Sequence, residues 1–254
     1  MARIKLVGFV SRLRSLGLPF FWPWGDRAWI GHRAVFSRDT GLTLIETSNL
    51  RSMNMNTEIT IHPKLQHCGL TTGNLDGMLE WYGKVLGITV NKRVAALAGS
   101  PFKTVAFASN DEVNHRLSFF ETPDLPTDAD KDRHARVQHI AFEYQTLDDL
   151  LGTFVRLKKL GIPLLWAADQ FIQTALYYED PDGNIIELNV NNFTSDWTVT
   201  EQLKALPSRL HVNVDPEKMI AARKTGVSAW ELHERALAGE FAPTAAYELH
   251  TTRW

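Results

Sequence analysis

The chain has 254 residues, a formal net charge of −2 and a single cysteine, Cys68. A charge this close to zero gives no general attraction to nucleic acid or to membrane surfaces, so we expect neither as a partner. A lone cysteine excludes an intramolecular disulfide and favours a reducing, cytoplasmic compartment. The apolar fraction of 44% is sufficient for a core, and no apolar run approaches the roughly 18 residues of a membrane-spanning helix.

Residues 1–55 differ in composition from the rest of the chain. The first 25 residues contain four Arg or Lys residues and no acidic residue, followed by a cluster of aromatic side chains. Such a segment is typical of a targeting or membrane-surface element, but also of a translation start placed too early, because Met53 and Met55 directly precede the regular part. We predict that residues 1–55 form a poorly packed N-terminal extension.

From residue 64 onward the pattern repeats at a spacing of 72 residues. Gln66-His67 recurs as Gln138-His139. Apolar residues at helical spacing predict helices over 75–86 and 147–160, and strand-like segments surround them. The predicted strands are 65–71, 89–97, 104–109 and 116–120, then 137–142, 163–167, 174–178 and 185–190. We therefore predict an α+β domain over 56–199, built from two βαβββ modules, 64–122 and 137–195.

The second module ends in a predicted β-hairpin. Its turn, Asp180-Pro181-Asp182-Gly183, joins two extended runs. The strand that leaves the turn is largely apolar, yet it carries Glu187. A carboxylate on such a strand needs a partner, because its desolvation is costly. Glu187 is therefore interpreted as a salt-bridged or solvent-exposed residue, or as a metal ligand.

Residues 200–254 are predicted to be a C-terminal helical extension. Asp215-Pro216 combines an N-cap residue with proline at the first helical position, and Ser228 opens a capping box with Glu231. Gly226 and Gly239 end the two predicted helices. The histidines of this segment are interpreted as surface or interface residues.

Two histidines at equivalent repeat positions and one out-of-pattern carboxylate suggest a metal site. Either His67 or His139 alone is more often a core or strand-edge residue. A pseudo-twofold axis that relates the two modules would bring the histidines together, and Glu187 would complete the set. Two imidazoles and one carboxylate with open positions are the facial triad of non-haem Fe(II) oxygenases.

These motifs resemble the vicinal oxygen chelate superfamily, which includes glyoxalases, fosfomycin and bleomycin resistance proteins and type I extradiol catechol dioxygenases. The resemblance covers residues 64–195 and rests on the Gln-His pairs, the Asp-Pro-Asp-Gly-Asn turn and the Ile-Ile-Glu-Leu strand. It implies an incomplete barrel around a metal held by His67, His139 and Glu187. It also favours Fe(II), with Mn(II) as the alternative.

Further positions resemble the extradiol dioxygenases in particular. These enzymes carry a catalytic histidine where this chain has His115, and a tyrosine ten residues before the glutamate ligand, here Tyr177. Glyoxalase I enzymes have a fourth ligand where this chain has Ser118, so the site is expected to be open. The larger extradiol enzymes carry another histidine near residues 167–170. Here that segment has none, and Asp169 or Gln170 is a candidate to fill part of its role.

The resemblance implies extradiol cleavage of a catecholic substrate with O₂. His115 would act as general acid, and Tyr177 would hydrogen-bond a substrate oxygen. The alternatives are a glyoxalase-type metal-dependent isomerase or lyase, and a non-catalytic drug-binding resistance protein. A small-molecule partner and a homo-oligomer are expected.

Overall fold

The computed structural model of the chain describes residues 34–37, 41–44, 63–126, 128, 130–206 and 211–248. The chain divides into two units, residues 1–63 and 64–254, and each is described by itself. In the first unit, the described residues form an antiparallel hairpin of β1 (Ala34–Ser37) and β2 (Gly41–Leu44), which was not predicted. The rest of the predicted extension lies outside the described residues. The predicted domain boundaries after residues 55 and 199 stay predictions.

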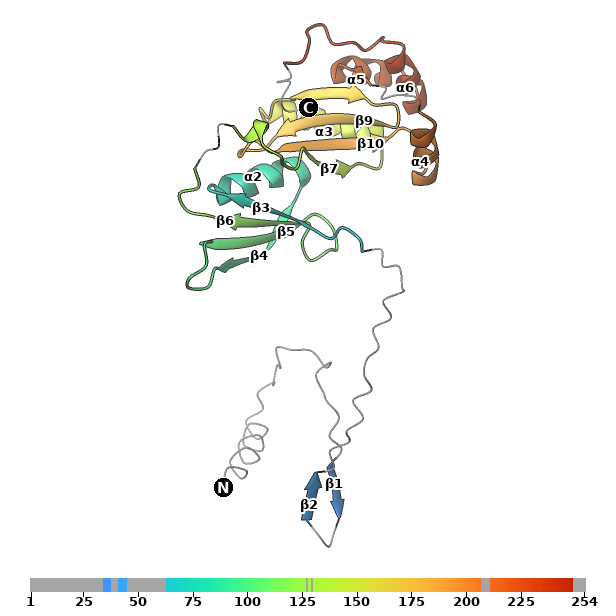
Figure 1. Ribbon diagram of the computed structural model, residues 1–254. Helices are drawn as coiled ribbons and strands as arrows, with labels where there is room; N and C mark the ends of the chain where they lie inside the picture. Colours follow the sequence, from blue (N-terminus) through green and yellow to red (C-terminus); the bar gives the residue numbers. More distant parts are fainter. Residues whose placement is uncertain are drawn as a thin grey trace. The chain divides into compact units, whose positions relative to one another are not determined.

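The first half of the second unit is one βαβββ module (Figure 1). Its sheet has the order β3-β6-β5-β4, and β3 runs parallel to β6. The helix begins where predicted because the Asn74 side chain accepts a hydrogen bond from the Gly77 N–H, and it ends at Gly87, whose φ is 67°. The elements are β3 (Cys68–Thr72), α2 (Leu75–Leu86), β4 (Thr89–Ala95), β5 (Thr104–Ser109) and β6 (Leu117–Glu121).

The second half repeats this plan after a single 3₁₀ turn at Lys131–Arg133. The Thr146 side chain caps the helix by accepting a hydrogen bond from the Asp149 N–H. The sheet order is β11-β8-β9-β10-β7, and β10 runs parallel to β7. The elements are β7 (Ile140–Glu143), α3 (Leu147–Lys159), β8 (Trp166–Asp169), β9 (Gln173–Glu179) and β10 (Ile185–Asn191).

The predicted fold of two βαβββ modules is confirmed, and within the described residues the two sheets do not close into a barrel. The predicted first strands begin too early, however. The structure starts them at Cys68 and Ile140, so His67 and His139 each directly precede a strand. Each histidine therefore lies just before an edge strand of its sheet and not within the strand.

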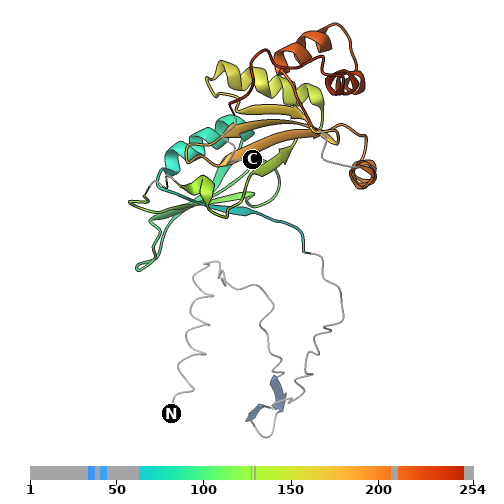
Figure 2. The ribbon, with the colours of Figure 1, turned by 45° about the horizontal axis from the view of Figure 1, so that its top comes forward.

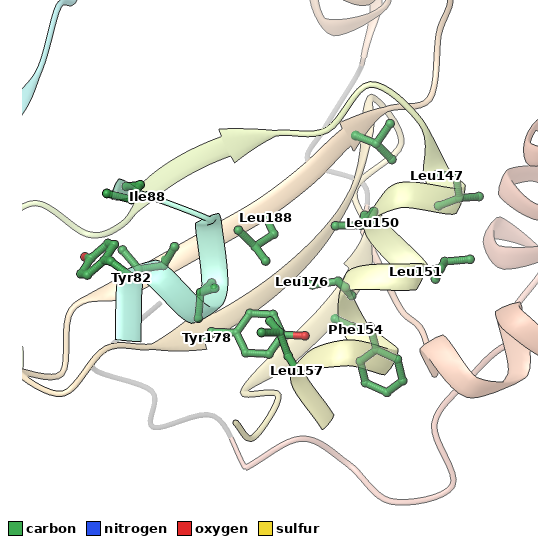
Figure 3. Packing of buried hydrophobic residues seen from close by; sticks show 14 of the residues in the cluster. Tyr82, Ile88, Leu147, Leu150, Leu151, Phe154, Leu157, Leu176, Tyr178 and Leu188 are labelled. Atoms are coloured by element: carbon green, nitrogen blue, oxygen red, sulfur yellow. The ribbon is translucent and has the colours of Figure 1, made fainter. Parts of the chain in front are cut away.

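One apolar core serves both modules, because α2 and α3 cover the same side of the two sheets (Figure 2). The apolar stripe of α3 packs on the inward-facing residues of the second sheet, and α2 lies beside it (Figure 3). The residues that Figure 3 labels are Tyr82, Ile88, Leu147, Leu150, Leu151, Phe154, Leu157, Leu176, Tyr178 and Leu188. None of the described helices is long and apolar enough to cross a membrane.

The hairpin turn between β9 and β10 also joins the two modules. Asp180 Oδ1 accepts hydrogen bonds from the backbone N–H groups of Asp182, at 3.0 Å, and Asn184, at 2.8 Å. Asp180 Oδ2 accepts one from the buried Tyr82 hydroxyl of α2, at 3.0 Å. Burial raises the pKa of Asp180 despite these bonds. Gly183 takes the positive φ that the turn requires, 74°.

The C-terminal segment contains the two predicted helices and two elements that were not predicted. The strand β11 pairs with the edge strand β8, so this segment extends the second sheet. The unpredicted helix, residues 196–205, has no buried residues. Its sequence lacks the apolar stripe by which a helix is usually recognised. The elements are α4 (Asp196–Ala205), β11 (Val212–Asn213), α5 (Pro216–Lys224) and α6 (Ala229–Leu237).

Candidate metal centre

Glu187 lies in the middle of β10, on the face of the sheet opposite the helices. Its register partners are Tyr177 on β9 and Ala141 on β7. Its chain neighbours Ile186 and Leu188 are fully buried in the core beneath the helices. Because side chains alternate along a strand, Glu187 faces away from that core. The β10 strand thus presents one carboxylate on the outer face of the sheet.

This carboxylate is only 2% exposed, and both of its oxygens are engaged. Oε1 accepts hydrogen bonds from Gln173 Nε2, at 2.6 Å, and from Asn189 Nδ2, at 2.7 Å. Oε2 accepts one from the Tyr177 hydroxyl, at 2.9 Å, and lies 3.0 Å from His139 Nε2. Burial alone would raise the pKa of Glu187, but the hydrogen bonds and the charge of His139 outweigh it, so the pKa is lowered. Glu187 is a buried anion.

The two Gln-His pairs have the same local geometry. His139 Nδ1 contacts Gln138 Oε1, and His67 Nδ1 contacts Gln66 Oε1. The Gln66 amide nitrogen donates elsewhere, to Asn114 Oδ1 at 3.1 Å. Because an amide oxygen only accepts hydrogen bonds, each Nδ1 carries a proton, and each Nε2 presents a lone pair whenever its ring is neutral. Histidines that bind metals through Nε2 are commonly oriented by such a partner on Nδ1.

The contact between His139 and Glu187 fits a cation. A neutral Nε2 lone pair and a carboxylate oxygen repel each other at 3.0 Å unless a proton or a cation lies between them. Two ligands at right angles, each about 2.1 Å from an ion, are about 3.0 Å apart. The pair therefore has the chemistry and the spacing of two adjacent metal ligands.

The third predicted ligand, His67, lies beside His115. Their ring centroids are 4.4 Å apart, and the His115 ring also meets the edge of Phe107 at 5.0 Å. Burial, followed by the charge of His67, lowers the pKa of His115, so a neutral imidazole is favoured. Among the described residues, no three His, Cys, Asp or Glu side chains form a group that could hold a metal. The structure thus joins His139 to Glu187 and His67 to His115.

Tyr177 is buried and contacts the Glu187 carboxylate. Its hydroxyl donates to Glu187 and accepts from Gln170 Nε2, at 2.8 Å. Its ring stacks on Trp166 with a centroid distance of 4.7 Å and an interplanar angle of 21°. Gln173, which donates to Glu187, was not among the predicted site residues. The two-residue alternation of β9 places Gln173 on the same face as Tyr177, but the predicted strand began at residue 174 and left Gln173 outside it.

Of the two candidates to replace the missing histidine, only Gln170 contacts the site. Asp169 is fully buried and pairs with His233 of α6, with Nδ1 and Oδ2 2.8 Å apart. Asp169 therefore does not fill part of the role of the missing histidine, and Gln170 is left as the candidate. His211, directly before β11, reaches Trp166 with a ring-centroid distance of 6.0 Å.

Ser118 occupies the place of Glu187 in the first module. It pairs with Gly69, as Glu187 pairs with Ala141, and 72 residues separate Gly69 from Ala141. Ser118 is 1% exposed, and its hydroxyl has no hydrogen-bond partner. Cys68 packs against the core, and burial raises the pKa of its thiol, which favours a packing role over a nucleophilic one.

Comparisons with known proteins agree with this architecture. Residues 64–188 match the family described as the Glyoxalase/Bleomycin resistance protein/Dioxygenase superfamily. The chain is 31% identical over 183 residues to biphenyl-2,3-diol 1,2-dioxygenase 3 of Rhodococcus globerulus, covering 71% of this chain and 92% of that protein. It is 29% identical over 188 residues to biphenyl-2,3-diol 1,2-dioxygenase 2 of the same organism, covering 73% and 94%. The chain therefore belongs to the glyoxalase/bleomycin resistance protein/dioxygenase superfamily.

Proposed function

We propose that the chain is a metal-dependent extradiol dioxygenase, which opens the ring of a catecholic substrate with O₂ next to the two hydroxyl groups. The observation that carries the proposal is the buried Glu187 carboxylate facing His139 Nε2 at 3.0 Å. The superfamily alone allows other reactions. The names of the two curated relatives, both dioxygenases of a biphenyl-diol, favour ring cleavage among them.

We propose that His139 and Glu187, which are in contact, hold the metal together with His67, the third ligand that the resemblance implies. In the described residues these three side chains do not yet form one group, so binding would have to bring His67 to the pair. Fe(II) is proposed in the first place and Mn(II) as the alternative. The bound metal would supply a Lewis-acidic, redox-active centre for the substrate oxygens and O₂. The chain supplies two imidazoles whose Nδ1 atoms are engaged by glutamines, and one buried anion. Ser118 stands where a further carboxylate would be needed to close the site, so positions stay open for the substrate.

His115 is proposed to move the proton that ring opening requires. It lies against the predicted ligand His67, and its lowered pKa favours the neutral imidazole, which can take up a proton and later return it as a general acid. It is not one of the proposed ligands. His115 would thus act on the proton, while its neighbour His67 would bind the metal.

Tyr177 is proposed to hold the substrate hydroxyl. In the structure its single hydroxyl proton is donated to Glu187 Oε2. With Glu187 acting as a metal ligand, the Tyr177 hydroxyl could donate its proton to a substrate oxygen instead. Gln170 donates to the same hydroxyl and would keep its orientation. Hydrogen bonding to an ionised substrate oxygen favours the charged form.

We propose that aromatic side chains of the first module line the substrate side of the site. Phe107 pairs in register with Ser118 and meets His115 at 5.0 Å, while Phe120, on the same face as Ser118, meets Phe102 at 5.0 Å. Flat apolar side chains favour an aromatic ring over an aliphatic substrate. A catechol, with biphenyl-2,3-diol as the first compound to test, fits both the polar and the aromatic side of the site.

The proposal is tested by loading the protein with Fe(II) without oxygen and then adding a panel of catechols in aerated buffer. We expect O₂ uptake that matches the appearance of a yellow ring-fission product. Conversion of a 2-oxoaldehyde–thiol adduct without O₂ uptake would instead indicate a glyoxalase-type isomerase. Tight binding of a drug-like ligand with no turnover of any compound would indicate a resistance protein.

The ligand set is tested separately, by metal content. Both His67→Ala and His139→Ala should lose bound Fe(II) after dialysis. Exposed His134, which is paired with Asp128 at 3.3 Å, provides the control His134→Ala, which should retain the metal. Full metal content in His67→Ala would show that His67 is not a ligand. The predicted cytoplasmic location and homo-oligomeric state stay predictions.

A further inference from the structure

A buried contact ties helix α6 to the second sheet. His233 is 3% exposed, and its Nδ1 lies 2.8 Å from Oδ2 of the fully buried Asp169. The rings of Trp230, Phe193 and Phe171 surround it, with centroids 5.1, 6.1 and 5.9 Å from that of His233. The proposed reaction uses neither His233 nor Asp169. A charge-assisted hydrogen bond enclosed in this way nevertheless fixes both of its partners in position.

Asp169 in turn holds the tight turn between β8 and β9. Its Oδ1 accepts a hydrogen bond from the backbone N–H of Phe171 at 2.9 Å. The carboxylate also accepts hydrogen bonds from Asn192 Nδ2, at 3.2 and 3.3 Å, and from Thr174 Oγ1, at 3.3 Å. Phe171 has a φ of 70°, a left-handed conformation that is unfavourable for a residue with a bulky side chain. The turn therefore depends on Asp169 for its shape.

The opposite side of this turn faces Glu187. Gln170 donates to the Tyr177 hydroxyl at 2.8 Å, and Gln173 donates to Glu187 Oε1 at 2.6 Å. Gln173 also donates to Gln170 Oε1 at 3.0 Å, so the two amides are linked. Asp169, the last residue of β8, thus meets α6 through His233, while Gln170, the next residue, meets the site through Tyr177.

From these contacts we infer that His233 is a positioning residue for the candidate metal centre. Through Asp169 it holds the turn 169–173, and the turn places Gln170 and Gln173 on Tyr177 and Glu187. The C-terminal helix α6, which lies outside the paired modules, is thereby part of the support of the site. This inference rests on the proposed function for the identity of the site, but the mechanical link can be tested without metal.

The link is tested by a double-mutant cycle between His233 and Gln173. His233→Phe keeps a ring inside the aromatic surround and removes the donor to Asp169. Gln173→Ala removes the donor to Glu187. In urea unfolding of the metal-free protein, we expect non-additive effects, with the double variant unfolding at the same urea concentration as the more severe single variant. Additive effects would overturn the inference, because the two residues would then act independently.

The consequence is tested by Fe(II) affinity, measured without oxygen by competition with a chromogenic chelator. Loss of a supporting hydrogen bond around a metal typically costs 10–100-fold, and for this longer path we expect a loss of roughly tenfold in His233→Phe. His233→Asn should restore affinity, because its amide nitrogen takes the place of Nδ1. If His233→Phe does not fold, His233→Gln, whose amide lies farther from the main chain, replaces it in both measurements.

A matched control distinguishes this effect from general loosening of the C-terminal segment. Arg223 of α5 forms an ion pair with Asp148 of α3, with its Nε 2.7 Å from Oδ1. Its hydrogen bonds to described residues go to Asp148 and to the Val227 carbonyl, not to the turn 169–173. Arg223→Met should lower stability without changing Fe(II) affinity. An equal loss of affinity in both variants, or none in His233→Phe, would contradict the inference. Failure of the wild-type protein to bind Fe(II) would contradict the proposed function instead, while the unfolding cycle would still decide the link.

Discussion

The two modules share one backbone plan but divide the chemistry between them. In each, the last strand runs parallel to the first with the same register, so Ser118 stands opposite Gly69 as Glu187 stands opposite Ala141. Yet the Ser118 hydroxyl has no partner, whereas the Glu187 carboxylate receives donors on both oxygens. Equivalent positions thus differ in whether the chain around them can support a buried charge.

The neighbouring strand explains this difference. Phe107 pairs with Ser118 in the first module, and Tyr177 pairs with Glu187 in the second. A phenylalanine offers no donor, while tyrosine supplies a hydroxyl that is itself held by Gln170. A repeated fold therefore provides two equivalent strand positions, and a buried anion is supported only where the adjacent side chains donate hydrogen bonds.

The largest effect should come from removing the negative charge of Glu187. Glu187→Gln keeps the size of the side chain but removes its negative charge. Fe(II) affinity should fall by more than the roughly 100-fold that loss of a supporting hydrogen bond can cost. Ser118→Ala, at the equivalent place in the first module, should leave the affinity unchanged. Anaerobic titration with Fe(II) measures both, and equal affinities for the two variants would remove Glu187 from the ligand set.

The next effect concerns the histidine that only the first module has. His115→Ala should keep the metal and lower kcat by roughly 10²–10⁴-fold, the usual contribution of a general acid or base. Metal analysis and steady-state O₂ uptake on the same sample separate the two possibilities. If His115→Ala loses its metal, His115 is a ligand, the site is more closed than proposed and an isomerase becomes the better assignment.

Sequence patterns located most of the fold, for a physical reason. The apolar periods of 75–86 and 147–160 match the observed α2 and α3, because each helix buries one stripe against a sheet. The strand β11 has only two residues and helix α4 buries none, so neither carries a period to detect. Local patterns predict elements that bury a face and miss those that do not.

The candidate site was predicted less completely, because its support depends on contacts between distant residues. The pairing of His139 with Glu187 agrees with the repeat and the out-of-pattern carboxylate. Gln173 has many possible roles in a sequence, and only its contact with Glu187 shows which one it has. His233 lies 64 residues from Asp169, and no local pattern relates them. The proposed ligands are readable from motifs, but the residues that would position them are not.

A smaller effect should distinguish the connections that precede the last strand of each module. Asp180→Ala would leave the buried Tyr82 hydroxyl and two backbone N–H groups without their acceptor. We expect it to lower the free energy of unfolding by about 3 kcal/mol, the upper range for an unsatisfied buried group. Asp111, in the connection before β6, is solvent-exposed and pairs with Arg116 at 2.7 Å, so Asp111→Ala should cost less. Urea unfolding compares the two, and equal losses would show that Tyr82 does not join the modules through Asp180.

The smallest effect should come from Ser118 itself, measured as stability rather than metal affinity. Its buried hydroxyl has no partner, so its desolvation is not offset by a hydrogen bond. Ser118→Ala removes that hydroxyl, but it also removes the contacts of one atom next to Gly69. These opposing terms should leave the free energy of unfolding unchanged or raised by up to about 1 kcal/mol in urea titration. A clear loss of stability would mean that the Ser118 hydroxyl is hydrogen-bonded in solution, and that the two modules differ less at this position than their contacts indicate.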